Sequence, residues 1–186
     1  MEFTHREYGY LIGETLKKFK CCNFQDALSI DSTDSSLKKI IIRHDIDFSP
    51  SSALLMAKLE NNLGAKSNYT VMLSSCAYNP FEKETRTCLK EIAKLGHNIG
   101  LHFDASSENI STEEELHSQI AKQAKILEEL LEVEINFFSY HNTNEFVLSC
   151  RENYYGGLIN CYAKSIFSLF SYTSDSHGIW LYENWF

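Results

Sequence analysis

Two pairs of polar side chains stand near the ends of stretches that the sequence predicts as strands. Asp45 and Asp47 follow the apolar, β-branched run 40–42, and His102 and Asp104 close the stretch that begins at residue 96. Because residues two apart in an extended chain point to the same face, the members of each pair lie on one side of their strand. Carboxylates and imidazoles gathered in this way are typical of metal sites and of acid–base catalysis.

His141 adds a second imidazole, because it follows directly after the apolar stretch 135–140. One carboxylate and two imidazoles, from Asp47, His102 and His141, form a ligand set that suits a zinc-like divalent ion. Such a set leaves a coordination position open for water, as hydrolytic metal sites require. His141 is alternatively a catalytic acid. For Asp45 and Asp47, the alternative is that they cap the helix that begins just downstream.

Strands and helices alternate along the chain. Strands are predicted at 40–47, 67–73, 99–103 and 135–140, and helices at 8–20, 53–63, 80–95 and 111–131. This alternation predicts a parallel sheet with crossover helices, an α/β fold whose active site gathers at the carboxyl ends of the strands. Beyond residue 142 the pattern predicts short strands around Gly156 and Gly157, with no clear helices.

Length and charge limit the classes of protein that this chain can belong to. Its 186 residues predict one main domain, 38–186, on which an N-terminal helix and connecting segment, 1–37, pack. A formal charge of -8 disfavours nucleic acids and anionic membranes as partners. No apolar run is long enough to span a bilayer and the polar N-terminus does not fit a secretory signal, so we expect a cytoplasmic protein. The six cysteines include no C-x-x-C pair, and we expect reduced thiols.

Two ordered motifs resemble a known family. Arg43-His44-Asp45-Ile46-Asp47 is followed by Gly64-Ala65-Lys66 and then by Gly96-His97-Asn98-Ile99-Gly100-Leu101-His102. In this order they resemble the polysaccharide deacetylase, or NodB-homology, superfamily, and most closely its branch associated with surface-polysaccharide gene clusters. Residues 139–141 and 174–176, with Trp180, are similar to later segments of that branch. The resemblance covers roughly residues 38–180.

The resemblance implies an irregular or incomplete (β/α) barrel that uses a metal, usually zinc, to remove N-acetyl groups from amino sugars. The substrate would be an N-acetylated sugar, nucleotide-linked, lipid-linked or polymeric, used in surface polysaccharide biosynthesis. By the same analogy Asp45 would be the general base and Asp47 a metal ligand, with bound water attacking the acetamide carbonyl. One residue separates the two aspartates here, whereas better-known members have them adjacent, so the two roles could be exchanged.

The chain departs from the family pattern in two places. Ser106 stands where the family has a second histidine ligand, which leaves His141 to replace it. The chain also ends at Phe186, whereas family members usually continue to a late strand that carries a catalytic histidine. We therefore expect the C-terminal part of the barrel to be missing, with His177 or His141 as the general acid. The apolar segments 166–170 and 180–186 would then stay uncovered, which predicts either self-association into a homo-oligomer or a truncated product with weak or absent hydrolysis.

The remaining polar residues of these motifs are expected to contact the substrate: Arg43, His44, Asp104, Tyr140 and Asp175. Two other functions stay open. One is a catalytically impaired remnant of the fold that acts as a binding or scaffold protein. The other is a magnesium-dependent phosphatase in which Asp45 and Asp47 form a D-x-D motif. A D-x-D glycosyltransferase would leave His102 without a role.

Overall fold

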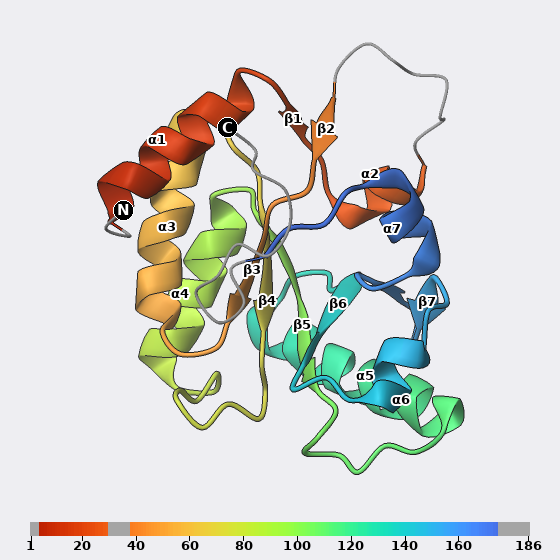
Figure 1. The fold of residues 1–186 in the computed structure, drawn as a ribbon. Helices are drawn as coiled ribbons and strands as arrows, with labels where there is room; N and C mark the ends of the chain where they lie inside the picture. The colour runs from red at the N-terminus through yellow and green to blue at the C-terminus, as the bar shows by residue number, and fades with distance from the viewer. Residues whose placement is uncertain (1–3, 30–37, 175–186) are drawn as a thin grey trace.

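The computed structural model describes residues 4–29 and 38–174, and its centre is a six-stranded, mostly parallel sheet (Figure 1). The strand order is β3-β4-β5-β6-β8-β7, and each neighbouring pair is parallel except β7 with β8. The strands are β3 (Arg43–Ile46), β4 (Asn68–Val71), β5 (Asn98–Asp104), β6 (Phe137–His141), β7 (Tyr154–Tyr155) and β8 (Leu158–Asn160). The carboxyl ends of the first four of these therefore meet at one edge of the sheet.

Three helices cover one face of the sheet, which we call the outer face. They are α3 (Pro50–Leu63), α4 (Lys83–Lys94) and α5 (Glu113–Leu131), and each connects one parallel strand to the next (Figure 1). Apolar side chains of these helices pack against Val71, Leu101 and Phe103, which are fully buried. The free energy gained by removing this apolar surface from water is the main contribution that holds the helices on the sheet.

The residues at the helix ends explain where these crossovers begin and stop. Ser49 caps α3 through its side chain, Pro50 is the first helical residue, and Gly64 ends the helix at a φ of 81°. Glycine adopts positive φ without the steric penalty of a Cβ atom. Thr112 and Glu115 form a capping box at the start of α5. The crossover lengths are thus set by local sequence.

The opposite, inner face of the sheet carries Arg43, Asp45, Thr70, His102 and Ser139. Two short helices, α2 (Phe24–Leu28) and α7 (Lys164–Leu169), form an apolar cluster with the part of this face around Phe137 and Ile159. α1 (His5–Leu16) lies along α3, and a small parallel sheet pairs β1 (Lys20–Cys21) with β2 (Lys39–Ile40) (Figure 1). α6 (Glu145–Ser149) follows β6.

The predicted parallel sheet with crossover helices is confirmed, with three differences. The predicted strand 40–47 is divided, because β2 pairs with β1 in the small sheet whereas β3 pairs with β4 in the six-stranded sheet. The expectation of no helices beyond residue 142 is wrong, since α6 and α7 are present but too short to show a periodicity. In the described residues no strand joins β7 to β3, so a closed barrel is not seen there.

Three further expectations concern the surface and the thiols. All six cysteines are free. Among the helices of the described ranges, none combines the length and apolar character needed to cross a membrane. Near the C-terminus, Ile166 is buried against α2, contrary to the expectation of an uncovered segment, whereas Phe167 and Leu169 are exposed. Residues 180–186 lie outside the described residues.

Candidate metal centre

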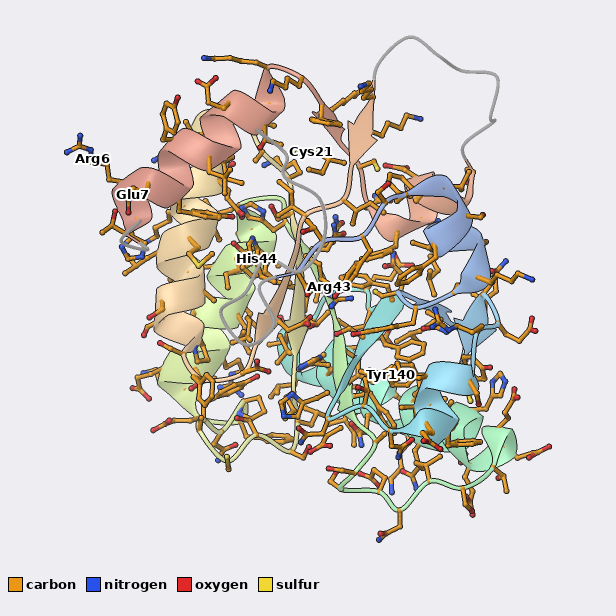
Figure 2. All side chains as sticks on the ribbon, in the orientation of Figure 1. Arg6, Glu7, Cys21, Arg43, His44 and Tyr140 are labelled. Atoms are coloured by element: carbon orange, nitrogen blue, oxygen red, sulfur yellow. The ribbon has the colours of Figure 1, made fainter. Side chains whose placement is uncertain are left out.

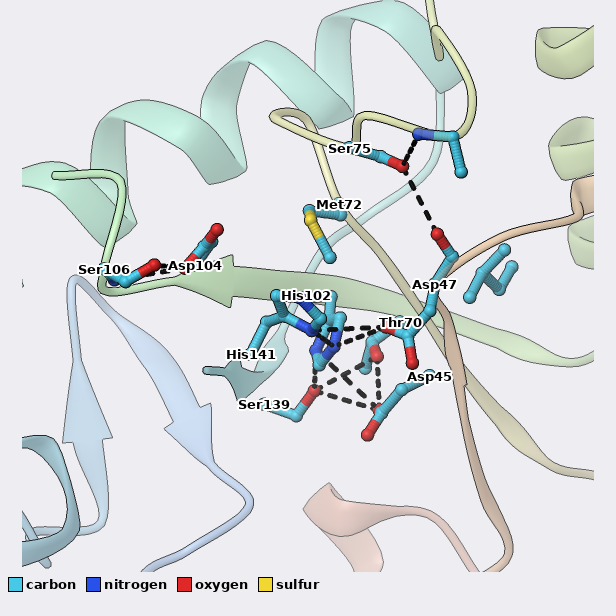
Figure 3. Close-up of polar contacts among 12 residues, drawn as sticks. Asp45, Asp47, Thr70, Met72, Ser75, His102, Asp104, Ser106, Ser139 and His141 are labelled. Carbon is cyan, nitrogen blue, oxygen red and sulfur yellow. Dashed lines mark hydrogen bonds and ion pairs between the residues drawn. The ribbon is translucent and has the colours of Figure 1, made fainter. Parts of the chain in front are cut away.

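Asp47, His102 and His141 meet at the carboxyl-end edge of the sheet (Figure 3). The His102 Nε2 atom lies 3.2 Å from Asp47 Oδ1 and 3.1 Å from His141 Nδ1. The third separation, between His141 Nδ1 and Asp47 Oδ1, is 3.3 Å. The structure thus brings together the three residues that the sequence predicts as metal ligands.

The register of β5 and β6 places the two histidines. His102 pairs with Ser139 across the two strands, so His141 lies two residues farther along and on the same face. The chain turns away directly after His141, where Asn142 adopts a φ of 49°. Asparagine tolerates this left-handed conformation better than most residues. The imidazole of His141 therefore stands at the very end of its strand.

Asp47 lies just past the end of β3, and the loop after β4 holds it there. The Asp47 N–H donates to the Asp45 carbonyl at 3.1 Å, and the Ser75 hydroxyl donates to the Asp47 carbonyl at 3.3 Å. The carbonyl of the preceding residue, Ile46, accepts a hydrogen bond from the Tyr78 hydroxyl at 2.8 Å. These bonds fix the backbone that carries the carboxylate.

The three ligand atoms fit a tetrahedral metal ion in two respects. Zinc bonds of about 2.0 to 2.1 Å to nitrogen and oxygen put neighbouring atoms of a tetrahedron about 3.3 Å apart, close to the separations of 3.1, 3.2 and 3.3 Å seen here. The Asp47 Oδ1 atom is also buried and has no hydrogen-bond partner among the described residues. A cation between this oxygen and the two imidazole nitrogens would satisfy it.

The site opens to solvent on one side. The side chain of His102 is 3% exposed, whereas those of His141 and Asp47 are 27% and 38% exposed. Water or a small substrate can therefore reach the side chains of His141 and Asp47, although the Asp47 Oδ1 atom itself is buried. Catalytic zinc sites keep one side open, whereas structural zinc sites are closed.

Asp45 lies on the other side of the His102 ring, with its Oδ1 atom 3.9 Å from His102 Nδ1. The Thr70 hydroxyl donates to Asp45 Oδ1 at 2.6 Å, and Ser139 Oγ lies 3.0 Å from the same oxygen. Burial by itself would raise the pKa of the Asp45 carboxyl. The nearby charge of Arg43, with that of His102 and the two hydroxyl hydrogen bonds, outweighs burial, so the pKa lies below its ordinary value.

Arg43 and Asp104, two of the expected substrate-binding residues, have partners of their own. The Arg43 guanidinium pairs with Asp45 Oδ2 at 3.2 Å and lies 5.3 Å from the centre of the Tyr162 ring. The Asp104 carboxylate accepts hydrogen bonds from the backbone and the hydroxyl of Ser106 at 3.1 and 2.7 Å. Arg43 therefore supports Asp45, and Asp104 closes the turn after β5.

His44 and Tyr140 lie on the outer face, away from the three ligand atoms. His44 points toward α3, where its Nε2 atom lies 2.7 Å from Glu60 Oε1 (Figure 2). Tyr140 is buried in the core between the sheet and the helices. The strand alternation explains both positions, because each residue neighbours an inner-face residue in sequence. Asp175 and His177 lie outside the described residues.

Thr70 and Ser139 are polar residues of the site to which the sequence analysis assigned no role. Both are fully buried inside strands. A signal for Ser139 was present, because it is a hydroxyl in an apolar strand two residues before His141. Buried hydroxyl groups need hydrogen-bond partners, so such a position indicates a polar neighbour on the same face.

No model of a known protein family matches this chain, and no curated protein matches it in sequence. Several solved structures are similar to it, among them a deacetylase and a domain of a xylanase. The deacetylase PplD of Streptococcus pyogenes, in complex with acetate, matches with a TM-score of 0.54 and 14% identity, over 76% of this chain and 66% of that chain. The Xyl-CE4 domain of a multidomain xylanase from the hindgut metagenome of Trinervitermes trinervoides matches with a TM-score of 0.42 and 12% identity, over 59% of this chain and 52% of that one.

The match to the Streptococcus pyogenes deacetylase concerns the fold. It spans just under two thirds of that solved chain, at 14% identity. The described residues therefore have a mixed α/β fold, with a mainly parallel sheet, like that of a deacetylase. Function has to be argued from the site itself.

Proposed function

We propose that this protein is a zinc-dependent hydrolase that removes an N-acetyl group from an amino sugar by cleaving its amide C–N bond. The observation that carries the proposal is the meeting of Asp47 Oδ1, His102 Nε2 and His141 Nδ1 within 3.3 Å of one another. Three protein ligands with a side open to solvent are the arrangement of hydrolytic zinc sites. A fold shared with a deacetylase in complex with acetate, the acid that deacetylation releases, supports an acetyl substrate.

The residues around the site have different roles in the proposed reaction. Zinc held by Asp47, His102 and His141 would polarise the acetamide carbonyl and lower the pKa of bound water. His102 closes the buried side of the site, and the exposed side of Asp47 and His141 admits the sugar. The general-base role expected for Asp45 stays a prediction. The motif resemblance supports a sugar, nucleotide-linked or lipid-linked, that enters a surface polysaccharide.

The two other functions have less support. A D-x-D phosphatase would need Asp45 as a nucleophile, but its oxygens are engaged by Thr70, Ser139 and Arg43. A non-catalytic remnant would not need to retain a solvent-accessible set of metal ligands. The closeness of the Asp47, His102 and His141 ligand atoms supports the metal-dependent hydrolase over this alternative.

Metal content and acetate release test the proposal. Wild-type protein, Asp47→Ala and His102→Ala are loaded with zinc, desalted and measured by elemental analysis. His5→Ala is the matched control, because His5 is an exposed histidine at the start of α1. Acetate release is measured with N-acetylglucosamine oligomers and with UDP-N-acetylglucosamine. We expect about one zinc per chain in the wild type and the control, and a sharp loss of zinc and of acetate release in the two site variants.

Two results would contradict the proposal. Unchanged zinc content in both site variants would show that the metal site is misassigned. A zinc-loaded wild-type protein that releases no acetate from either class of substrate would instead favour a binding or scaffold role.

A further inference from the structure

We propose that Ser139 and Asp45 are positioning residues that hold the proton of the His102 imidazole on Nδ1 and so keep the Nε2 lone pair available to a metal ion. The inference rests on the proposed metal site. It gives Asp45 a task that differs from that of a general base, because Asp45 would act through Ser139 and His102.

His102 lies between two different polar environments. Its Nδ1 atom lies 2.7 Å from Ser139 Oγ, on the buried side of the ring. Its Nε2 atom faces Asp47 and His141 on the side of the candidate metal position. A neutral imidazole carries one proton on one of its two nitrogens, so the partner of Nδ1 decides whether Nε2 can bind a metal.

The donors and acceptors around Asp45 set the direction of this hydrogen bond. The Asp45 carboxylate, paired with Arg43, only accepts, and the Thr70 hydroxyl already donates to its Oδ1 atom at 2.6 Å. Ser139 Oγ lies 3.0 Å from the same oxygen and 3.1 Å from Thr70 Oγ1. Ser139 has a single proton. Whether it is given to Asp45 Oδ1 or to Thr70 Oγ1, the serine oxygen is left to accept from His102 Nδ1–H.

The opposite direction is disfavoured by burial. If Ser139 donated to His102 Nδ1, its lone pairs would face the Asp45 carboxylate at 3.0 Å without a proton between them. Thr70 and Ser139 are fully buried and His102 is 2% exposed, so the contact would be poorly screened. The Nε2 atom would then carry a proton and point it into the metal position.

Asp45 is itself anchored, which makes the chain of hydrogen bonds stiff. Arg43 holds Asp45 Oδ2 at 3.2 Å and stacks on Tyr162. Figure 3 shows the resulting path from Asp45 through Ser139 to His102. Groups that hold a metal-binding histidine in this way typically change metal affinity about 10- to 100-fold when they are removed.

The tautomer of His102 in metal-free protein is the direct test. Nitrogen-15 NMR of the imidazole at about pH 8, above the ordinary histidine pKa, distinguishes a proton on Nδ1 from one on Nε2. We expect Nδ1–H in the wild type, a shift toward Nε2–H in Ser139→Ala, and about 10- to 100-fold weaker zinc binding in that variant. Ser139→Thr, which keeps the hydroxyl, should restore both properties.

Thr70→Val is the matched control, because it removes a neighbouring hydroxyl that bonds to Asp45 and to Ser139 but does not contact His102, and Ser139 can still donate to Asp45. It should keep the Nδ1–H tautomer. The proposal is overturned by a wild-type His102 that carries its proton on Nε2, or by a folded Ser139→Ala protein with unchanged tautomer and zinc affinity. The NMR measurement needs no metal. A protein that failed to bind zinc would therefore contradict the proposed function, while the tautomer would still decide the role of Ser139.

Discussion

Replacing Glu60 with glutamine is expected to lower the free energy of unfolding by about 3 kcal/mol. Glu60 belongs to α3 and is fully buried. Its carboxylate accepts hydrogen bonds from the Tyr8 hydroxyl of α1, from the Tyr69 hydroxyl at 2.6 Å and from His44 Nε2 at 2.7 Å. Glutamine keeps the shape of the side chain but turns an N–H group toward these donors. At least one hydrogen bond between the N-terminal helix, α3 and the sheet is therefore lost.

The magnitude follows from the pKa of Glu60. Burial by itself would raise this pKa, but the hydrogen bond and charge of His44, with the hydrogen bonds from Tyr69 and Tyr8, outweigh burial. They lower the pKa from 4.5 to about 2. At about 1.4 kcal/mol per pKa unit, the difference of about 2.5 units corresponds to about 3 kcal/mol. Because the pKa is lower in the folded state, this stability is present above pH 4.5 and is lost as the pH falls toward 2.

Urea unfolding followed by far-ultraviolet circular dichroism measures the effect, at neutral pH and in a series of acidic buffers. The wild type should lose stability more steeply than Glu60→Gln as the pH falls below 4.5, because the variant lacks the group that titrates. Glu91→Gln is the matched control. Glu91 lies on the surface of α4 in an ion pair with Lys94, and its replacement should leave the urea midpoint almost unchanged.

A loss below about 1 kcal/mol for Glu60→Gln would refute this reasoning, since it would mean that the buried carboxylate is no more stabilising than a surface one. Parallel acid profiles for the two proteins would do the same. Either result would show that burial and hydrogen bonding nearly cancel at this position.

Two smaller changes test the packing of the sheet. Tyr140→Phe should leave the urea midpoint unchanged or raise it, because the Tyr140 hydroxyl is buried without a hydrogen-bond partner among the described residues; a clear fall would reveal a partner for the hydroxyl. Gly100→Ala should destabilise by about 1 to 3 kcal/mol, because its Cβ would lie 2.4 Å from the Phe137 ring. Gly13→Ala, whose Cβ meets nothing within 4 Å, is the matched control and should stabilise α1; equal effects of the two glycine changes would contradict the predicted clash.

The meeting of Asp47, His102 and His141 could be predicted from the sequence because the signal for each is local. An apolar stretch followed by a polar residue marks a strand end, and alternation of strands with helices implies that such ends meet at one edge. His141 is predicted in this way from its place directly after the apolar stretch 135–140. The distances between the ligand atoms of Asp47, His102 and His141 could not be predicted from the sequence and are seen only in the structure.

The supporting contacts could not be predicted because they depend on register between strands. Thr70 and Ser139 reach Asp45 from positions 25 and 94 residues away. Glu60 is an ordinary polar residue in the helical pattern, and its burial depends on where His44 lies. The outward direction of His44 was nevertheless implied by its place between Arg43 and Asp45, so its assignment to the substrate site conflicted with the alternation of the strand.

Strand β3 contacts different partners on its two faces, and this limits how its length can vary. Arg43 and Asp45 face the inner polar groups, while His44 and Ile46 face α3 and the core. Inserting or deleting one residue within this strand would exchange the faces and bring a second carboxylate against Glu60. Like charges in a buried contact are strongly unfavourable. Related chains should therefore tolerate insertions and deletions in the loops around β3, but none between Arg43 and Asp47.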